Sequence, residues 1–213
     1  SYLLRGKAVL SIPNPIDTKV YHPMDQGMAR ELLGLPSGER LLLFGALNVT
    51  DKRKGIDYLI EALRRMEKQD VELVVFGQVK DDIRGLFPVP IHSMGYLSDE
   101  SKIVALYNAV DMFITSSLEE NLPNTIMESM ACGTPCVGFE IGGIPEMIDH
   151  RVNGYVANYK DAGDLANGIQ WVLEHEDRLA LSDACVKKVQ ENYTEEVVAK
   201  QYTTLYEKLL KGE

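Results

Sequence analysis

From Arg40 onward, short apolar runs alternate with longer amphipathic segments, which is the pattern of successive βα units. The apolar runs predict strands at 41–45, 72–76, 91–94, 111–114, 135–139 and 154–157. The segments between them predict helices at 56–68, 99–108, 124–131 and 161–174. Because strands separated by helices pair in parallel through right-handed crossovers, we predict an α/β fold with a doubly wound parallel sheet. Ligands of such sheets bind beyond the carboxyl ends of the strands.

The two ends of the chain depart from this alternation. Residues 1–23 are rich in turn-forming residues, including Pro13, Pro15 and Pro23, and predict a linker. The linker leads into a short helix at 28–33, and we assign residues 24–213 to one domain. Residues 178–191 and 195–211 predict two successive helices with no strand between them. These helices either cap the sheet or dock onto a part of the protein outside this chain.

Charge and length limit the classes of function. The chain has 213 residues, with 22 Lys and Arg against 32 Asp and Glu, a net charge of -10. This sign is wrong for a protein that follows a nucleic-acid backbone electrostatically, so we expect no nucleic-acid partner. A small anionic ligand remains compatible, because local cations and backbone amides can hold a phosphate. Apolar runs such as 41–47 are far shorter than the roughly 20 residues that span a bilayer, so we expect no transmembrane segment.

The cysteines and the first residues bear on the cellular compartment. Cys132, Cys136 and Cys185 are too few for a disulfide framework and are not spaced as a zinc site, which favours a reducing compartment. We interpret them as small buried apolar side chains. No signal peptide is recognised after Ser1, and a start without Met indicates a piece of a longer protein. We therefore expect a cytoplasmic protein.

The densest candidate chemistry lies between residues 115 and 135, directly after the strand predicted at 111–114. Asn121 is the predicted N-cap of the helix at 124–131, and Pro123 suits its first turn. The amides and the positive dipole end of that helix would form an anion site at the ligand edge of the sheet.

Two glutamates and a basic run flank this candidate site. Glu120 and Glu128 are eight positions apart, which corresponds to roughly 12 Å along a helix. That span is comparable to an extended nucleoside diphosphate sugar, whose two ends carry hydroxyl groups for carboxylates to hold. Alternatively, both glutamates are solvated surface residues. The basic run Lys52, Arg53 and Lys54 is either a solvated charge run or, after the first strand, a phosphate clamp.

The segment from Glu120 to Pro135 resembles the signature of the retaining glycosyltransferases of family 4. In that signature two glutamates are separated by seven residues and followed by a helix that ends in Gly-Thr-Pro. Residues 12–14 and 21–23 are similar to the family's interdomain linker, and further similar segments follow in the family's order at 45, 54–57, 95–98, 142–146 and 153–154. The resemblance implies one half of a two-domain GT-B fold, the C-terminal, Rossmann-like, donor-binding half. It also implies that helices within 178–211 pack toward the missing N-terminal domain.

The resemblance also implies roles for individual residues. Glu128 would bind the ribose hydroxyls, and Glu120 would lie beside the transferred sugar. Arg53 and Lys54 would neutralise the diphosphate as it departs, so Glu120, Lys54 and Arg53 are the expected catalytic residues. The expected substrate-binding residues besides Glu128 are Gly45, Leu97, Asn121, Leu122, Asn124 and Thr125, with Leu97 offering backbone groups to the base.

The implied activity is hexosyl transfer from a nucleotide diphosphate sugar to an acceptor, with retention of the anomeric configuration, as in polysaccharide biosynthesis. No cofactor is required, and a UDP-sugar is favoured as donor over a GDP-sugar. The acceptor, a glycan or lipid-linked saccharide, would bind through the missing domain, as would any peripheral attachment to the inner membrane face. The chain alone is expected to be inactive.

Two departures from the family pattern keep other functions open. Ala46 stands where the family commonly has Arg, and Arg53 is the candidate replacement for that charge. Pro123 has no N–H, so one backbone contact to the donor must differ. The alternatives are a GT-B-like nucleotide-sugar epimerase, which needs no acceptor, and a non-catalytic α/β binding domain. No metal is expected, because the histidines are scattered, no Asp-x-Asp occurs, and Asp81 and Asp82 would diverge on a helix.

Overall fold

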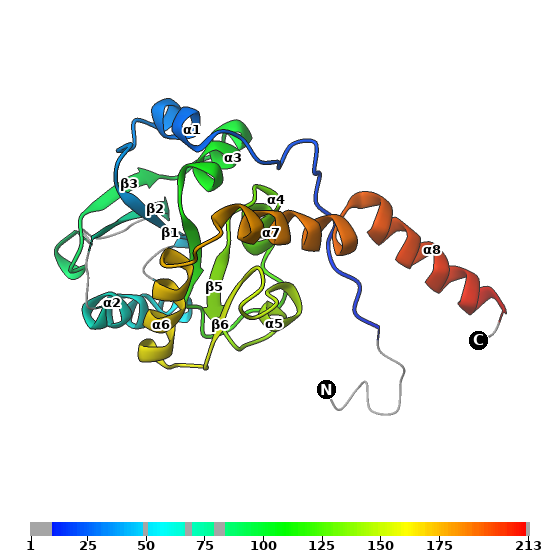
Figure 1. The fold of residues 1–213 in the computed structure, drawn as a ribbon. Coiled ribbons are helices and arrows are strands. Elements are labelled where there is room, and N and C mark those ends of the chain that lie inside the picture. Colours follow the sequence, from blue (N-terminus) through cyan, green and yellow to red (C-terminus); the bar gives the residue numbers. More distant parts are fainter. Residues whose placement is uncertain (1–9, 49–50, 67–69, 79–83, 212–213) are drawn as a thin grey trace.

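The structure is a computed structural model that describes residues 10–48, 51–66, 70–78 and 84–211 (Figure 1). Residues 1–9 of the predicted linker, and Asp81 and Asp82, lie outside the described residues. The sheet is six-stranded and parallel, in the order β3-β2-β1-β4-β5-β6. Its strands are β1 (Arg40–Asn48), β2 (Val71–Gln78), β3 (Ile91–Gly95), β4 (Met112–Thr115), β5 (Cys136–Phe139) and β6 (Gly154–Ala157). The predicted doubly wound sheet is thus confirmed.

The helices also follow the predicted segments. They are α1 (Gln26–Leu33), α2 (Ile56–Arg65), α3 (Glu100–Ala109), α4 (Asn124–Ala131), α5 (Ile144–Met147), α6 (Ala162–Leu173), α7 (Arg178–Asn192) and α8 (Glu195–Lys211), with short 3-10 turns η2 (Lys52–Lys54) and η3 (Arg84–Leu86). The short helix α5 was not predicted. Gly142 and Pro145 resemble turn residues, and four residues are too few to show a helical period.

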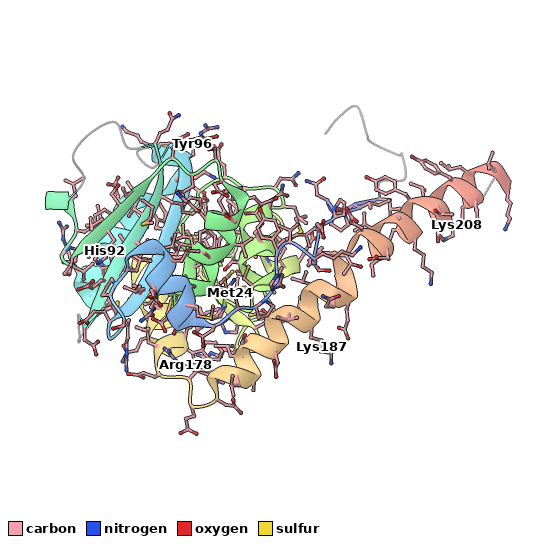
Figure 2. The ribbon with its side chains drawn as sticks, turned by 90° about the horizontal axis from the view of Figure 1, so that it is seen from above. Met24, His92, Tyr96, Arg178, Lys187 and Lys208 are labelled. Carbon is pink, nitrogen blue, oxygen red and sulfur yellow. The ribbon has the colours of Figure 1, made fainter. Side chains whose placement is uncertain are left out.

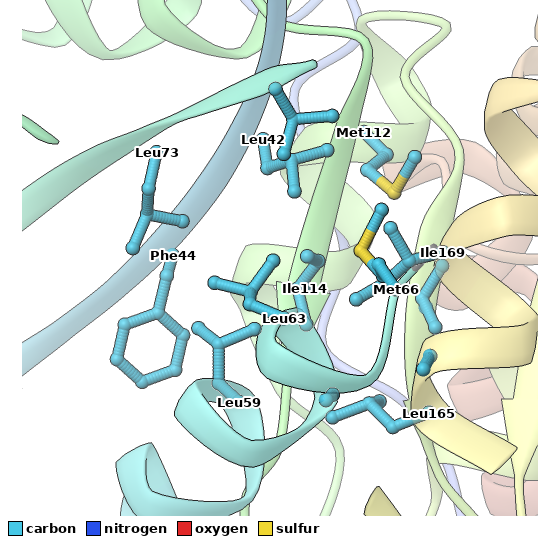
Figure 3. Close-up of a cluster of buried hydrophobic side chains, with 14 of the residues drawn as sticks. Leu42, Phe44, Leu59, Leu63, Met66, Leu73, Met112, Ile114, Leu165 and Ile169 are labelled. Atoms are coloured by element: carbon cyan, nitrogen blue, oxygen red, sulfur yellow. The ribbon is translucent and has the colours of Figure 1, made fainter. Parts of the chain in front are cut away.

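The sheet is covered on both faces, which explains why its strands are apolar runs and not alternating sequences. Along β1, Leu42 and Phe44 pack against α2 and α6, whereas Leu41 and Leu43 point to the opposite face. Figure 3 shows the first of these clusters, where Leu59 and Leu63 of α2 meet Leu165 and Ile169 of α6. The second cluster holds α1, α3, α4 and α7. The three cysteines are buried and free, as predicted.

The strand order fixes where a ligand can bind. The chain begins in the middle of the sheet at β1, moves outward to β2 and β3, and returns to β4 beside β1. This order is that of the Rossmann fold, whose crevice opens where the direction of winding reverses. The reversal here falls between the carboxyl ends of β1 and β4. The segments that follow Gly45 and Thr115 therefore line the crevice.

At the opposite, amino edge of the sheet, a buried carboxylate joins the outer helices to the strands. Asp111, whose side chain is 3% exposed, accepts hydrogen bonds from the backbone N–H of Leu41 at 2.7 Å and from Arg178 at 2.7 Å. Arg30 of α1 contacts the same carboxylate at 3.2 Å. The arrangement attaches α1 and the start of α7 to the sheet without occupying its ligand edge.

The last helix, α8, extends away from the rest of the domain, as Figures 1 and 2 show. Val198 is its one buried residue, while its exposed large apolar side chains are Tyr202, Tyr206, Leu209 and Leu210. The backbone N–H of Ile16 donates to the carbonyl of Tyr193 at 2.8 Å. The N-terminal segment and α8 therefore depart from the domain at neighbouring points.

Candidate functional site

A cleft of about 450 Å³ opens at the carboxyl ends of β1 and β4. It is lined by Asn14, Phe44, Gly45, Lys54, Phe113, Thr115, Ser117, Glu120, Leu122, Pro123, Asn124 and Thr125. An adjoining pocket of about 400 Å³ is lined by Arg53, Lys54, Glu119, Glu120 and Asn121. Lys54 and Glu120 line both hollows. The structure thus brings together eight of the ten predicted site residues, and the exceptions are Leu97 and Glu128.

The pair of Lys54 and Glu120 is the central electrostatic feature of the cleft. The Lys54 ammonium lies 2.5 Å from Glu120 Oε1, and the two side chains are 32% and 14% exposed. An ion pair this close and this sheltered from water is stronger than a typical surface pair. An anion that enters the cleft must therefore share the Lys54 charge with Glu120 or displace that carboxylate.

The turn that carries Lys54 and the loop that carries Glu120 are fastened to each other by the backbone. The N–H of Leu118 donates to the carbonyl of Arg53 at 2.7 Å, and the Ser116 hydroxyl donates to the carbonyl of Lys54 at 3.0 Å. Gly55 permits this approach, because a Cβ there would lie 2.0 Å from the Ser116 carbonyl oxygen and its φ is +64°.

A glycine pair supports the same loop from the other side. The N–H of Gly143 donates to the carbonyl of Asn121 at 2.5 Å. A Cβ on Gly142, which has φ +55°, would lie 2.0 Å from the carbonyl oxygen of Glu120. The structure shows that the two glycines hold the backbone on which Glu120 stands.

Arg53 is paired differently from Lys54. Its side chain is 68% exposed and contacts the carboxylate of Asp51, with Nη2 at 2.7 Å from Oδ2. The hydrogen bonds from Arg53 lower the pKa of Asp51 to about 2. Asp51 also caps η2 by accepting from the Arg53 N–H. Asp51 was not among the predicted site residues, although an Asp four positions before a glycine, with basic residues between them, is a capping signal.

The N-terminus of α4 faces the cleft without a side-chain cap. Pro123 occupies the N-cap position and makes no side-chain hydrogen bond, so the prediction of Asn121 as the cap was wrong. Asn121 is instead exposed and uses its backbone carbonyl to hold Gly143. Within the described residues, the N–H groups of Asn124 and Thr125 have no hydrogen-bond partner. Such free amides at a helix start attract anions.

Asn14 is a cleft residue that sequence reasoning placed only in the linker. Its Nδ2 donates to Oδ1 of Asn124 at 3.3 Å. The N-terminal segment therefore reaches the start of α4.

Glu128 lies one turn further along α4, outside the lining of the cleft. Its Oε2 accepts a hydrogen bond from the Tyr107 hydroxyl at 2.8 Å. Burial raises the pKa of Glu128, and the hydrogen bond from Tyr107 opposes that rise. Glu120 thus lies on the loop before α4, whereas Glu128 lies inside the helix.

Leu97 follows β3, two strands away from β1. Its side chain is partly buried against the core cluster that contains Tyr107 and Phe113, so it serves packing. Its predicted role, to offer backbone groups to a base, stays a prediction.

The histidines have structural surroundings. His92 pairs with Glu72 across β2 and β3, and His175 packs edge-on against Trp171. Among the described residues, no group of three or more His, Cys, Asp or Glu is arranged to hold a metal ion. No helix in the described part of the chain is long and apolar enough to cross a membrane.

Solved structures with the same architecture include a sucrose-phosphate synthase and glycosyltransferases. Sucrose-phosphate synthase from Thermosynechococcus elongatus superposes with a TM-score of 0.81 at 26% identity, covering 100% of this chain and 56% of that one. Anabaena HepE in complex with UDP gives a TM-score of 0.79 at 22% identity, covering 92% and 56%. The same protein has been solved with UDP-glucose. The class of fold is therefore one Rossmann-like half of a GT-B glycosyltransferase.

The sequence comparison defines the family. The family model described as glycosyl transferases group 1 matches residues 38–175. The chain belongs to this family. It is 25% identical to N-acetyl-alpha-D-glucosaminyl L-malate synthase of Bacillus anthracis, over 98% of this chain and 56% of the relative. The chain thus spans about half the length of the curated relatives it matches.

Proposed function

We propose that the protein transfers a hexose from a nucleotide diphosphate sugar to an acceptor with retention of configuration, and that this chain binds the donor. The observation that carries the proposal is the Lys54–Glu120 pair beside the uncapped start of α4, at the point where the sheet reverses. A cation, free amides and a carboxylate in one cleft suit a ligand with a diphosphate at its centre and hydroxyls around it.

The diphosphate is assigned to Lys54, Arg53 and the N–H groups of Asn124 and Thr125. In the reaction the bond between the anomeric carbon and the phosphate oxygen breaks, and its electron pair leaves with the nucleoside diphosphate. Positive groups fixed near that oxygen stabilise the developing charge, which is usually the largest contribution to such catalysis. The acceptor hydroxyl forms the new bond to the anomeric carbon and loses its proton to a group that this chain does not supply.

Glu120 is assigned to the sugar. When the diphosphate takes over Lys54, the Glu120 carboxylate loses its partner and becomes free to accept hydrogen bonds from sugar hydroxyls. The exchange is favourable because a half-buried carboxylate needs either a cation or hydrogen-bond donors. Gly45, Asn121 and Leu122 complete the walls on this side.

Glu128 is assigned to the ribose, and the backbone at Leu97 to the base. Pro123 has no N–H to offer, and its position as N-cap leaves Asn124 as the first amide of α4 available to an anion. The contact that Pro123 cannot make supports a donor placement that differs in detail from that of other family members.

The donor proposed first is a UDP-sugar, with a GDP-sugar as the alternative and no cofactor required. The UDP and UDP-glucose complexes of HepE support this order. The acceptor, a glycan or a lipid-linked saccharide, is assigned to the half of the protein that lies outside this chain. Without that half we expect binding but no transfer, and any membrane attachment of this cytoplasmic enzyme would also reside there.

The N-terminal segment and α8 support the assignment of donor and acceptor to different halves of the protein. The N-terminal segment and α8 leave the domain at Ile16 and Thr194, which form an isolated bridge. The N-terminal segment and the exposed apolar face of α8 therefore start from one place on the domain. We assign the interdomain linker to residues 1–23 and propose that α8 packs toward the other domain.

Thermal unfolding with UDP, GDP and ADP tests the proposal. A nucleotide at 100 times its dissociation constant adds about 2.7 kcal/mol to stability, or about 5–10 °C for a domain of this size. We expect a shift with one diphosphate, lost in Glu128→Ala. Glu61→Ala, which replaces a partly exposed glutamate on α2 that pairs with Arg65, is the control and keeps the shift. No shift with any of the three would contradict donor binding and favour a non-catalytic domain, whereas turnover without an acceptor would favour an epimerase.

A further inference from the structure

Tyr107 is the one described side chain that hydrogen-bonds Glu128, and it is held firmly. It lies on α3, is 1% exposed, and donates from its hydroxyl to Glu128 Oε2 at 2.8 Å. Its ring meets Phe76 and Phe113 edge-on, with centroids 6.3 Å and 6.0 Å away. The hydroxyl of Thr134 donates to the Tyr107 carbonyl at 2.7 Å. A ring packed between two strands in this way fixes the position of its hydroxyl group.

The hydrogen bond from Tyr107 involves only one of the two carboxylate oxygens of Glu128. Within the described residues, Oε2 accepts the bond from Tyr107 and Oε1 accepts none. Glu128 is itself only half buried, so a ligand can reach it. A carboxylate anchored through one oxygen keeps a single rotamer and presents the other oxygen in a fixed direction.

We propose that Tyr107 is a positioning residue for donor recognition: by holding Oε2 it fixes Glu128 so that Oε1 accepts from the ribose hydroxyls. Tyr107 thereby sets the preference of the site for ribonucleotides over 2′-deoxyribonucleotides. The inference rests on the proposed function, in which Glu128 binds the ribose.

The charges around Glu128 agree with these roles. The groups that face it are Tyr21 of the N-terminal segment, Glu100 and Tyr107 of α3, and Cys132 of α4. Burial raises the pKa of both tyrosines and of the Cys132 thiol, so these three groups are neutral near pH 7 and only Glu100 adds negative charge. Tyr107 therefore remains a donor, and it is the group that favours the charged form of Glu128.

The test compares Tyr107→Phe with a matched tyrosine elsewhere. Tyr155 is 4% exposed and donates to Asp164 Oδ1 at 2.8 Å, between β6 and α6 and away from the cleft. Tyr155→Phe therefore removes a hydroxyl that donates to the same kind of acceptor, from a residue that is also buried. UDP, GDP and ADP, each with its 2′-deoxy counterpart, are titrated calorimetrically into the 213-residue chain and into both variants between pH 5 and pH 8.

For Tyr107→Phe we expect about tenfold weaker binding of the preferred ribonucleotide, the effect of one lost charge-assisted hydrogen bond. Its discrimination against the 2′-deoxy form should fall toward unity. Because the lost hydroxyl favoured the charged carboxylate, the pH at which binding fails on acidification should move upward. Tyr155→Phe should match the unmodified chain in affinity, discrimination and pH profile, although both variants lose stability.

Two other outcomes overturn the inference in different ways. If the unmodified chain binds a nucleoside diphosphate and Tyr107→Phe equals Tyr155→Phe in affinity, discrimination and pH profile, the role of Tyr107 is wrong and the donor site stands. If the unmodified chain binds none of the three diphosphates, the proposed function fails and the inference fails with it.

Discussion

The ammonium of Lys54 lies 2.5 Å from Oε1 of Glu120, so the cation and the carboxylate of the cleft neutralise each other before any ligand binds. The two residues are 66 positions apart in the sequence. They meet because β1 and β4 are neighbours and both carry their functional segments at the carboxyl end. A dianionic ligand would convert this internal pair into two separate ligand contacts.

Replacing Lys54 should therefore affect binding and stability together. Lys54→Ala leaves Glu120 without its cation, and we expect nucleoside diphosphate affinity to fall at least tenfold, with about 1 kcal/mol lost in stability. Titration calorimetry and urea unfolding measure the two effects. Lys52→Ala, an exposed lysine on the same turn, should change neither by much. Equal losses of affinity in Lys54→Ala and Lys52→Ala would show that the total positive charge of the turn governs binding, and not the position of Lys54.

Gly142→Ala should destabilise the fold, because the new side chain would push against the backbone that carries Glu120. The new Cβ would lie 2.0 Å from the Glu120 carbonyl oxygen, and φ is +55°. We expect a loss of about 2–3 kcal/mol in urea unfolding, because steric contact with backbone adds to conformational strain.

Gly34→Ala separates these two contributions. Gly34 has a similar φ of +67°, but a Cβ there meets nothing within 4 Å. It should cost about 1 kcal/mol from conformational strain alone. If the two variants lose the same stability, the close approach to Glu120 has no energetic weight.

Most of the fold could be predicted from the sequence, because β1 to β6 are apolar runs flanked by amphipathic helices with recognisable caps. Asp99 and Asp161, for example, cap α3 and α6 with their side chains. The site was harder to predict from the sequence. Gly45 lies in β1, and Lys54 and Glu120 follow β1 and β4, so their place at the ligand edge was predictable. The pairing of Arg53 with Asp51 and the hydrogen bond from Tyr107 to Glu128 depend on side-chain orientation. The Asn121 prediction failed because the backbone near the cleft is shaped by contact with Gly143.

Glu128→Gln should stabilise the ligand-free chain. Burial raises the pKa of Glu128, so the charged carboxylate destabilises the fold at pH values above the unfolded pKa. That cost should disappear as the pH falls through the folded pKa. Gln removes the charge and keeps an oxygen for Tyr107.

Thermal unfolding at pH 7.5 and pH 4 checks this prediction. At pH 7.5 we expect the variant to unfold a few degrees higher than the unmodified chain, because one buried charge has been removed. At pH 4 this gain in unfolding temperature should shrink. Nucleotide binding should weaken in the same variant. A lower unfolding temperature at pH 7.5 would mean that the carboxylate stabilises the fold.

The outer part of α8 should contribute little to the stability of this chain. Beyond Val198 its large apolar side chains, such as Tyr206 and Leu210, are exposed at 59% and 88%. Removal of residues 199–211 should change the free energy of unfolding by less than about 0.5 kcal/mol in urea, as for surface changes in general. Val198→Ala, which empties a buried position, should cost about 1–2 kcal/mol. A truncated chain that unfolds more easily than Val198→Ala would show that α8 packs on its own domain. The apolar face would then not be available to the other half of the protein.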